Sequence, residues 1–237
     1  MLSKNDSNDK EAYIKSLFSN IAPRYDFLNS ILSLSLHHRW RRYCVRLCEL
    51  KNGNNAMDVC CGTGDFAFEL KRAVGSKGRV VGIDIAEPMV EIAKQKSKKL
   101  NLEVDFMVGK ADSIPFDSNT FDAAAVGFGL RNVTDVRKAV SEMVRVVKPG
   151  GRVVSLEIGR VDLPIIKYFW KLFFCVIGPK IAKIFGGMPE AYQYLPNSVM
   201  KFLSPNELAQ IFSECGLSNI KYRRLSFGAI MIHVGVK

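Results

Sequence analysis

The sequence lacks the features of an exported, membrane-spanning or zinc-binding protein. Its first 15 residues are polar where a signal peptide would have an apolar core, so we expect a cytoplasmic protein. It has six cysteines but no C-x-x-C pair, which argues against a zinc site and favours buried free thiols. Leu163–Gly187 is rich in aromatic residues, yet its longest uncharged run, Leu172–Pro179, is far shorter than the roughly 20 residues that span a bilayer.

Acidic residues are also few. The chain has 23 Asp and Glu residues against 34 Lys and Arg residues, a formal net charge of +11. Residues 151–237 contribute eleven basic and five acidic residues, or +6, and the basic residues lie among apolar ones rather than in a block. Such an excess is as typical of a protein that meets a membrane surface or an acidic ligand as of one that binds RNA.

Apolar strand patterns and amphipathic helix patterns alternate from Ala56 onward. This alternation predicts an α/β fold with a doubly wound, mainly parallel sheet, because parallel neighbours need a crossover connection. The last two strands are joined around Ser226-Phe227-Gly228, so we expect an antiparallel hairpin at the sheet edge. The expected strands are Ala56–Cys61, Arg79–Ile83, Val104–Val108, Phe121–Phe128, Arg152–Ile158, Ser218–Leu225 and Ala229–Val236, and the expected helices between them are Phe66–Val74, Glu87–Leu100 and Thr134–Val147.

No internal repeat or low-complexity linker divides the chain, which predicts a single domain over residues 1–237. We expect residues 1–50 to form a helical N-terminal cap and residues 51–160 a cofactor-binding core. Residues 161–204 are expected to form a helical insertion on the substrate side, and residues 205–237 a C-terminal helix with the edge hairpin.

The first strand is followed by Gly62-Thr63-Gly64, directly before a helix. Glycines at this point let a ligand approach the backbone, and ligands of such sheets bind at the carboxyl ends of the strands. The spacing Gly62-x-Gly64-x-x-Ala67 fits the relaxed fingerprint of dinucleotide-binding folds. On its own, a tight turn without a ligand explains this spacing equally well.

Acidic residues at successive strand ends favour a different ligand. Asp58 lies in the first strand, Asp84 ends the second, and Asp112 with Ser113 follows the third. Carboxylates repel a pyrophosphate but suit a cationic sulfonium cofactor, and Asp84 is placed to accept from both hydroxyls of a ribose. Asp112 is placed to accept from an adenine amino group. A single Asp more often caps a helix or forms a turn, but three at successive strand ends are harder to explain in that way.

These motifs together resemble a known family. The series "DVCCGTGD", "VVGIDIAEPM", "GKADSIPF", "FDAAAVGFGLRNV" and "VVKPGGRVV" is similar to class I S-adenosylmethionine-dependent methyltransferases. More narrowly, "LFSNIAPRYDFLNSILSLSLHHRWRR", "FGLRNV" and "AYQYLPNSVMKF" resemble the quinone C-methyltransferases of menaquinone and ubiquinone biosynthesis, from about Ser16 to the C-terminus. The resemblance implies a seven-stranded methyltransferase sheet, S-adenosylmethionine as cofactor and a prenylated quinol as substrate.

The resemblance and the strand-end pattern together give the expected site. The expected cofactor-binding residues are Asp58, Gly62, Thr63, Gly64, Asp84, Asp112 and Ser113, and no metal is expected. Arg131 and Asn132 follow the fourth strand, where a cation would stabilise the phenolate of a hydroquinone. Tyr25 could hydrogen-bond the ring oxygen. A surface salt bridge is the alternative for Arg131 and a core position for Tyr25, and we assign no role to His37 or His38.

The expected reaction is methyl transfer from S-adenosylmethionine to a ring carbon of demethylmenaquinol, with a ubiquinone precursor as the alternative. An RNA methyltransferase would suit the positive charge, but the sequence shows no RNA-binding module, so no nucleic-acid partner is expected. A non-catalytic cofactor-binding subunit would carry the same cofactor motifs.

The aromatic stretch Leu163–Phe185 has three interpretations. It could line a tunnel for an isoprenoid tail, or it could attach the protein weakly to the inner face of the membrane through its lysines. It could also be a helix that packs over the sheet. The sequence leaves the formation of a homo-oligomer open.

Overall fold

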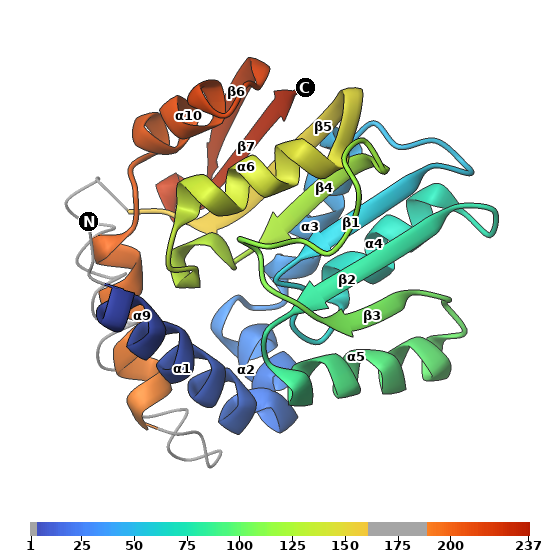
Figure 1. The fold of residues 1–237 in the computed structure, drawn as a ribbon. Helices are drawn as coiled ribbons and strands as arrows, with labels where there is room; N and C mark the ends of the chain where they lie inside the picture. The colour runs from blue at the N-terminus through green and yellow to red at the C-terminus, as the bar shows by residue number, and fades with distance from the viewer. Residues whose placement is uncertain (1–3, 161–188) are drawn as a thin grey trace.

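The computed structural model describes residues 4–160 and 189–237 (Figure 1). Their strands form one seven-stranded sheet in the order β3-β2-β1-β4-β5-β7-β6. The first five strands of this order are parallel, and β7 runs antiparallel between β5 and β6. The strands are β1 (Asn55–Val59), β2 (Arg79–Asp84), β3 (Asp105–Val108), β4 (Phe121–Gly127), β5 (Val147–Ile158), β6 (Ser218–Leu225) and β7 (Ile230–Val236). This arrangement confirms the expected doubly wound sheet with an antiparallel edge hairpin.

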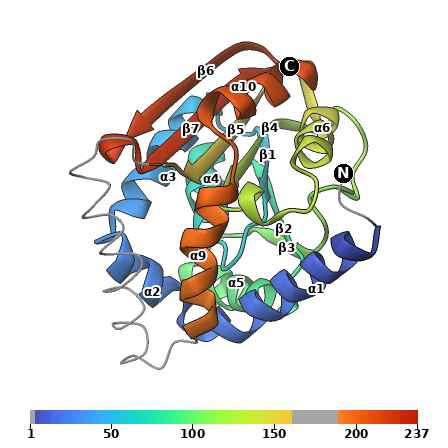
Figure 2. The ribbon, with the colours of Figure 1, turned by 90° about the vertical axis from the view of Figure 1, so that its left-hand side faces the viewer.

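Helices cover both faces of the sheet. One face packs against α3, α4 and α5, and the other against α6 and α10. The helices α1, α2 and α9 lie instead beyond the carboxyl ends of the parallel strands (Figures 1 and 2). The helices are α1 (Lys4–Ile21), α2 (Tyr25–Leu32), α3 (Leu36–Leu47), α4 (Asp65–Val74), α5 (Glu87–Leu100), α6 (Val136–Val146), α9 (Pro189–Lys201) and α10 (Pro205–Glu214), with 3-10 turns η1 (Ala22–Arg24), η2 (Leu130–Asn132) and η4 (Ser226–Gly228).

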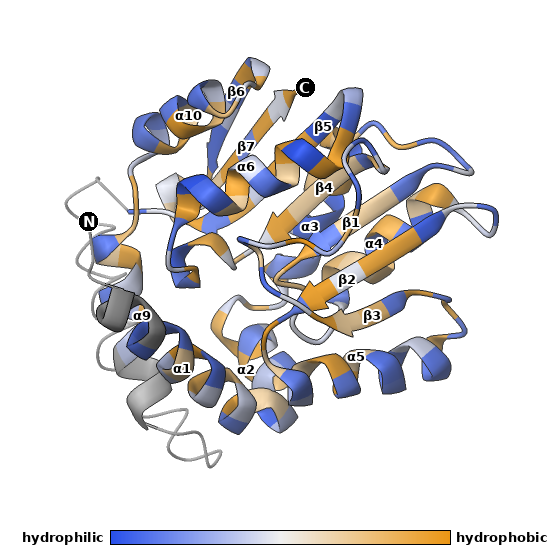
Figure 3. Cartoon of the chain, viewed as in Figure 1, coloured by the Kyte–Doolittle hydropathy of each residue, from blue (hydrophilic) through white to orange (hydrophobic). Residues whose placement is uncertain are grey.

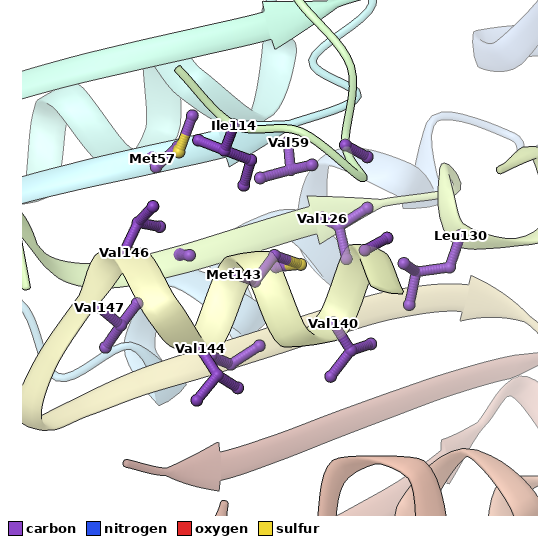
Figure 4. Close-up of a cluster of buried hydrophobic side chains, with 14 of the residues drawn as sticks. Met57, Val59, Ile114, Val126, Leu130, Val140, Met143, Val144, Val146 and Val147 are labelled. Carbon is purple, nitrogen blue, oxygen red and sulfur yellow. The ribbon is translucent and has the colours of Figure 1, made fainter. Parts of the chain in front are cut away.

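A large core cluster lies between α6 and the sheet. Met57 and Val59 of β1 and Val126 of β4 lie on the helix side of their strands, where Val140 and Met143 of α6 pack against them (Figure 4). All five side chains are fully buried. The hydropathy colouring shows the same pattern, because the strands are largely orange while the outward surfaces of the helices are largely blue (Figure 3). A core of this kind holds the strand ends in fixed positions.

Several element boundaries differ from those expected by one or two residues, and β5 begins earlier, at Val147 rather than Arg152. The sixth helix begins at Val136 because Asp135 is its N-cap and accepts a hydrogen bond from the Lys138 N–H at 2.9 Å. β5 begins at Val147, which pairs with Phe121. The turn at Gly150-Gly151 is also paired, since it exchanges backbone hydrogen bonds with Lys237. The sequence shows the Pro-Gly-Gly turn but not its partner at the other end of the chain.

The segment 161–188 lies outside the described residues, so the interpretations of Leu163–Phe185 and the buried free thiol expected for Cys175 stay predictions. The expected division of the chain, with residues 161–204 as a substrate-side insertion, is likewise a prediction. The five cysteines within the described residues are free thiols; Cys44, Cys48 and Cys61 are buried as expected, whereas Cys60 and Cys215 are partly exposed. Within the described part of the chain, no helix is long and apolar enough to cross a membrane.

Candidate active site

Two pockets adjoin each other at the carboxyl ends of the strands. The first, which we name the loop pocket, lies between the strand ends and α1 and contains about 750 Å³ of empty space including its mouth. The second, the apolar pocket, lies among α1, α2, the start of α3 and α9 and contains about 1490 Å³ including its mouth. Phe18, Tyr25 and Phe128 line both pockets and so form the wall between them.

Asp84 is the acidic centre of the loop pocket. Its Oδ2 accepts from the Gly62 N–H and its Oδ1 from the Ala86 N–H, each at 2.9 Å. Burial raises the pKa of this carboxyl, although the backbone N–H groups of Ala86 and Gly62 oppose the shift. A carboxylate offers about four lone-pair positions, so both oxygens can still accept from a ligand. Asp112 lines the same pocket.

The backbone beside the loop pocket is strained at two neighbouring strand ends. Cys60 after β1 and Phe128 after β4 have positive φ angles of +57° and +60°. A Cβ on Gly129 would lie only 2.5 Å from the Cβ of Cys60, so glycine is required where these two turns meet. Non-glycine residues in the left-handed region gather at ligand sites, where surrounding packing holds them.

Four of the expected cofactor residues do not line the loop pocket: Asp58, Thr63, Gly64 and Ser113. The Thr63 side chain is only 2% exposed, and its Oγ1 donates to Asp26 Oδ1 at 2.5 Å. Ser113 is exposed and forms an isolated bridge with Lys110. Gly64 adopts a φ of +87° as the N-cap of α4, where a Cβ would come within 2.7 Å of the Phe106 ring. Its glycine is therefore explained by packing.

Asp58 lies beneath the site rather than in it. It is 1% exposed, and no hydrogen bond of ordinary geometry reaches either carboxyl oxygen among the described residues. Burial raises its pKa to about 8, opposed chiefly by the charge of Arg41 and also by the backbone N–H of Ala67. At neutral pH this carboxyl is therefore largely protonated, which differs from the charged group that the sequence analysis assumed.

A network of charged side chains, which we name the cap network, ties the N-terminal helices to the glycine loop. Lys96 of α5 donates to Asp26 Oδ2 at 2.7 Å and to Asp65 Oδ1 at 2.6 Å. Arg41 of α3 pairs with Asp65 at 3.3 Å. Asp26 also accepts from Thr63, so α2, α3, α5 and the loop meet at one place. Asp65 therefore faces two cations and not the loop pocket, and the charges of Arg41 and Lys96 lower its pKa against the effect of burial.

Arg131 and Asn132 are neighbours in η2, but they line different pockets. Arg131 lines the apolar pocket and Asn132 the loop pocket. Arg131 Nη1 donates to the Phe128 carbonyl and lies 3.2 Å from Glu157 Oε2, while its buried Nε has no hydrogen-bond partner in the described structure. Asn132 Oδ1 accepts from the hydroxyl of Tyr194 at 3.0 Å. The surface salt bridge considered for Arg131 does not occur, because its side chain is only 6% exposed.

The sequence analysis missed Glu157, which is fully buried and accepts from the Leu130 N–H at 2.7 Å. Burial raises the pKa of Glu157, opposed chiefly by the charge of Arg131. The position of Glu157, a charged residue inside the apolar run of β5, is the feature of the sequence that could have identified it. Tyr194 was missed because its partner Asn132 is 62 residues away. Burial raises the pKa of Tyr194 to about 12 and raises that of Tyr25 as well, so both phenols stay protonated at neutral pH.

The apolar pocket is lined mainly by aliphatic and aromatic side chains. They include Leu17, Ile21, Leu28, Leu32, Leu36, Trp40, Ile158, Leu195 and Ile230. His37 also lines this pocket, and burial, with the charges of Arg41 and His38, lowers its pKa to about 4. His37 is therefore neutral, and Arg41 occupies its Nδ1. A pocket of this composition accepts an apolar ligand, with Arg131 and Tyr25 among the polar groups of its lining.

Comparisons with known proteins agree with this architecture. The model of the ubiE/COQ5 methyltransferase family matches residues 6–237. The chain belongs to this family. A demethylmenaquinone methyltransferase from Desulfitobacterium hafniense (strain Y51) is 41% identical over 231 residues, 97% of this chain and 91% of that protein. One from Staphylococcus haemolyticus (strain JCSC1435) is 39% identical over 232 residues, 98% of this chain and 97% of that protein.

The solved structures show the fold. A SAM-dependent methyltransferase from Aquifex aeolicus has a TM-score of 0.57 at 22% identity and covers 78% of this chain and 82% of its own. A second, from Thermotoga maritima, has a TM-score of 0.65 at 20% identity and covers 94% of this chain and 99% of its own. The expected family and the methyltransferase fold are confirmed, and S-adenosylmethionine is the cofactor.

Proposed function

We propose that the protein transfers a methyl group from S-adenosylmethionine to a ring carbon of demethylmenaquinol. The observation that carries the proposal is the pair of pockets that meet at Tyr25 and Phe128. One has a partly buried carboxylate and a glycine turn, and the other is apolar with an arginine in its lining. A polar cofactor in the loop pocket and a lipophilic acceptor in the apolar pocket can therefore meet at the wall that the two pockets share. The named activity of the relatives supports this assignment.

The residues of the loop pocket fit S-adenosylmethionine. Asp84 would accept from the ribose hydroxyls, the Gly62 backbone would lie against the methionine part, and Asp112 would accept from the adenine amino group. Ile85 and Met89 supply apolar walls for the adenine. The cofactor supplies an electrophilic methyl group, so the protein needs only to orient the acceptor and make it nucleophilic.

In this proposal Arg131 stabilises the phenolate of the quinol. A hydroquinone ring carbon becomes nucleophilic as a neighbouring hydroxyl loses its proton, and a cation beside that oxygen favours the loss. The unpartnered Nε of Arg131 is a buried donor that a ligand oxygen could satisfy. A guanidinium is too basic to accept the proton itself, so the proton leaves to another base or to water.

Tyr25 and Asn132 would orient the acceptor and the cofactor at the wall between the pockets. Because its pKa is raised, the Tyr25 phenol acts as a hydrogen-bond donor to a ring oxygen and not as a base. Asn132 is held by Tyr194 and by the Phe128 carbonyl, which accepts from its Nδ2 at 3.2 Å. This assignment gives a role to each of the three residues that were expected to be catalytic.

The isoprenoid tail of the substrate would occupy the apolar pocket. A tail of this kind resides in a lipid bilayer, so the proposal includes weak, peripheral contact of a cytoplasmic protein with the membrane. The lysines first considered for this contact, Lys167, Lys171, Lys180 and Lys183, lie outside the described residues. The described part of the chain offers a different surface for this contact.

The test is a methylation assay with the purified chain and a short-tailed demethylmenaquinol. We expect a product heavier by one methyl group, whose formation depends on S-adenosylmethionine. A ubiquinone precursor and a mixed RNA, each offered as sole acceptor, are expected to be poor substrates. Binding of S-adenosylmethionine without turnover of any acceptor would contradict the proposal and favour a non-catalytic subunit.

A further inference from the structure

Two turns at the apolar pocket expose large apolar side chains. Leu34, in the turn between α2 and α3, is 80% exposed, and Phe227, in η4 between β6 and β7, is 72% exposed. These are the two most exposed large apolar side chains among the described residues. Leu34 lines the apolar pocket, and so do Ser226, the first residue of η4, and Ala229, which follows η4 directly. Figure 2 shows the start of α3 and the turn between β6 and β7 on the same side of the molecule.

Both turns hold their exposed side chain in an unfavourable backbone conformation. Leu34 and Ser35 have φ angles of +50° and +59°, and Ser226 and Phe227 have +49° and +58°. Backbone hydrogen bonds fix the turns, from the Ser35 N–H to the Ser30 carbonyl at 2.7 Å and from the Ala229 N–H to the Ser226 carbonyl at 3.1 Å. A non-glycine residue with a positive φ angle costs free energy. Burial of Leu34 or Phe227 does not offset this cost within the described structure.

The segments that carry these turns contain no acidic residue. Residues 27–48 hold four arginines and neither Asp nor Glu, and residues 215–237 hold two lysines, two arginines and again neither Asp nor Glu. Each segment therefore carries a formal charge of +4. Arg39 and Arg42 on α3 and Lys221 and Arg223 on β6 are exposed. We call Leu34, Phe227 and these four exposed cations the docking face.

We propose that the docking face binds an anionic lipid bilayer, with Leu34 and Phe227 inserted among the headgroups. The mouth of the apolar pocket would then open toward the hydrocarbon, so that a prenylated quinol could enter without crossing water. This inference rests on the proposed function for the identity of the lipid substrate.

The chemistry of the docking face favours a bilayer over other occupants. Exposed apolar side chains flanked by cations match a membrane interface, where the apolar groups enter the acyl boundary and the cations meet the headgroups. A second copy of the chain would place two faces of the same positive charge together, which is unfavourable. RNA would use the cations and could stack a base on Phe227, but it would leave Leu34 without a partner, because single-strand binders use aromatic rings and not aliphatic side chains to hold bases.

The first test is cosedimentation with vesicles of phosphatidylcholine alone and of phosphatidylcholine mixed with phosphatidylglycerol. We expect wild type to bind the anionic vesicles at low salt and to be released by high salt. The variant Leu34→Ser/Phe227→Ser should bind them more weakly by on the order of tenfold or more, since it loses two inserted side chains. The control Leu100→Ser/Met107→Ser removes two exposed apolar side chains near β3, at the opposite sheet edge, and should bind as wild type does.

The second test removes charge. Arg39→Gln/Arg42→Gln should weaken binding at low salt by roughly fivefold for each cation removed, whereas Lys98→Gln/Lys99→Gln on α5 should have little effect. Wild type that stays in the supernatant at low salt would overturn the proposal. So would equal losses in the docking-face and control variants, or binding that RNA displaces and that Leu34→Ser/Phe227→Ser leaves unchanged.

A third test separates the docking face from the reaction. Phe227→Ser should slow the methylation of a long-tailed quinol carried in anionic vesicles but leave the methylation of a soluble short-tailed quinol unchanged. Equal slowing of both would overturn docking as the role of Phe227. If wild type fails to methylate the soluble quinol, the proposed function is wrong whatever the vesicles show. If wild type methylates the soluble quinol but does not bind vesicles, only the docking proposal is wrong.

Discussion

The loop pocket and the apolar pocket share a wall but are built from different parts of the chain. The loop pocket consists mainly of residues that follow β1, β2, β3 and β4, together with one side of α1. The apolar pocket draws on the N-terminal helices, the end of β5, the segment around Tyr194 and the turn before β7. Strand ends lie at one edge of the sheet by topology, whereas the apolar pocket exists only after distant segments pack together.

If the pockets have separate ligands, substitutions in them should affect different kinetic constants. The largest expected effect is on the rate. Arg131→Ala should lower kcat by roughly 10²–10³-fold, the range typical of a lost donor to a developing oxyanion, while the affinity for S-adenosylmethionine stays nearly constant. Single-turnover kinetics and titration calorimetry on the same preparation measure both. A parallel loss of cofactor affinity would mean that Arg131 supports the loop pocket instead.

The next largest effect is expected on cofactor affinity. Asp84→Ala should weaken S-adenosylmethionine binding by about 1.5–3 kcal/mol, because the ribose loses a charged acceptor. Asp84→Asn keeps the shape but not the charge and should be intermediate. Calorimetry with wild type and both variants checks this, and NADH should not compete in any of them. Unchanged affinity in Asp84→Ala would contradict the ribose assignment.

The sequence predicts the loop pocket better than the apolar pocket for a physical reason. Asp84 ends β2, and Gly62 and Asp112 lie within four residues of the ends of β1 and β3, so their proximity could be predicted from the strand pattern alone. Thr63 lies in the same loop, yet its hydroxyl points to Asp26, a partner on another element 37 residues away. Lys96 is 70 residues from Asp26, and no local pattern signals this pairing.

The cap network connects the two regions, and its loss should lower the free energy of unfolding. Lys96→Met removes a cation shared by Asp26 and Asp65, whose side chains are 40% and 17% exposed. We expect a loss of about 1–2 kcal/mol in the free energy of unfolding, measured by urea denaturation. Lys94→Met breaks the exposed pair with Glu91 on the same helix and should cost no more than about 0.5 kcal/mol. Equal losses would show that the network adds nothing beyond a surface pair.

A separate effect is expected on the pH dependence of stability. Because the folded pKa of Asp58 is raised to about 8, the folded protein binds a proton that the unfolded chain has already released. Stability should therefore fall as pH rises through the window between the unfolded value near 4 and the folded value near 8, by at most about 1.4 kcal/mol for each pH unit. Asp58→Asn should flatten this dependence. The check is the free energy of unfolding from urea denaturation between pH 5 and pH 8. If it has the same slope against pH in Asp58→Asn as in wild type, a group other than Asp58 binds the proton.

The most direct test of the two-pocket account fills each pocket separately. Ser33→Trp puts a large side chain into the apolar pocket, and Thr134→Trp puts one into the loop pocket. The measurement is the dissociation constant of S-adenosylmethionine together with KM for a short-tailed demethylmenaquinol in both variants. The account predicts that Ser33→Trp raises KM for the quinol and leaves the dissociation constant of S-adenosylmethionine unchanged. Thr134→Trp should instead raise the dissociation constant of S-adenosylmethionine more than the quinol KM. If Ser33→Trp raises the dissociation constant of S-adenosylmethionine by the same factor as KM for the quinol, the assignment of one ligand to each pocket is contradicted.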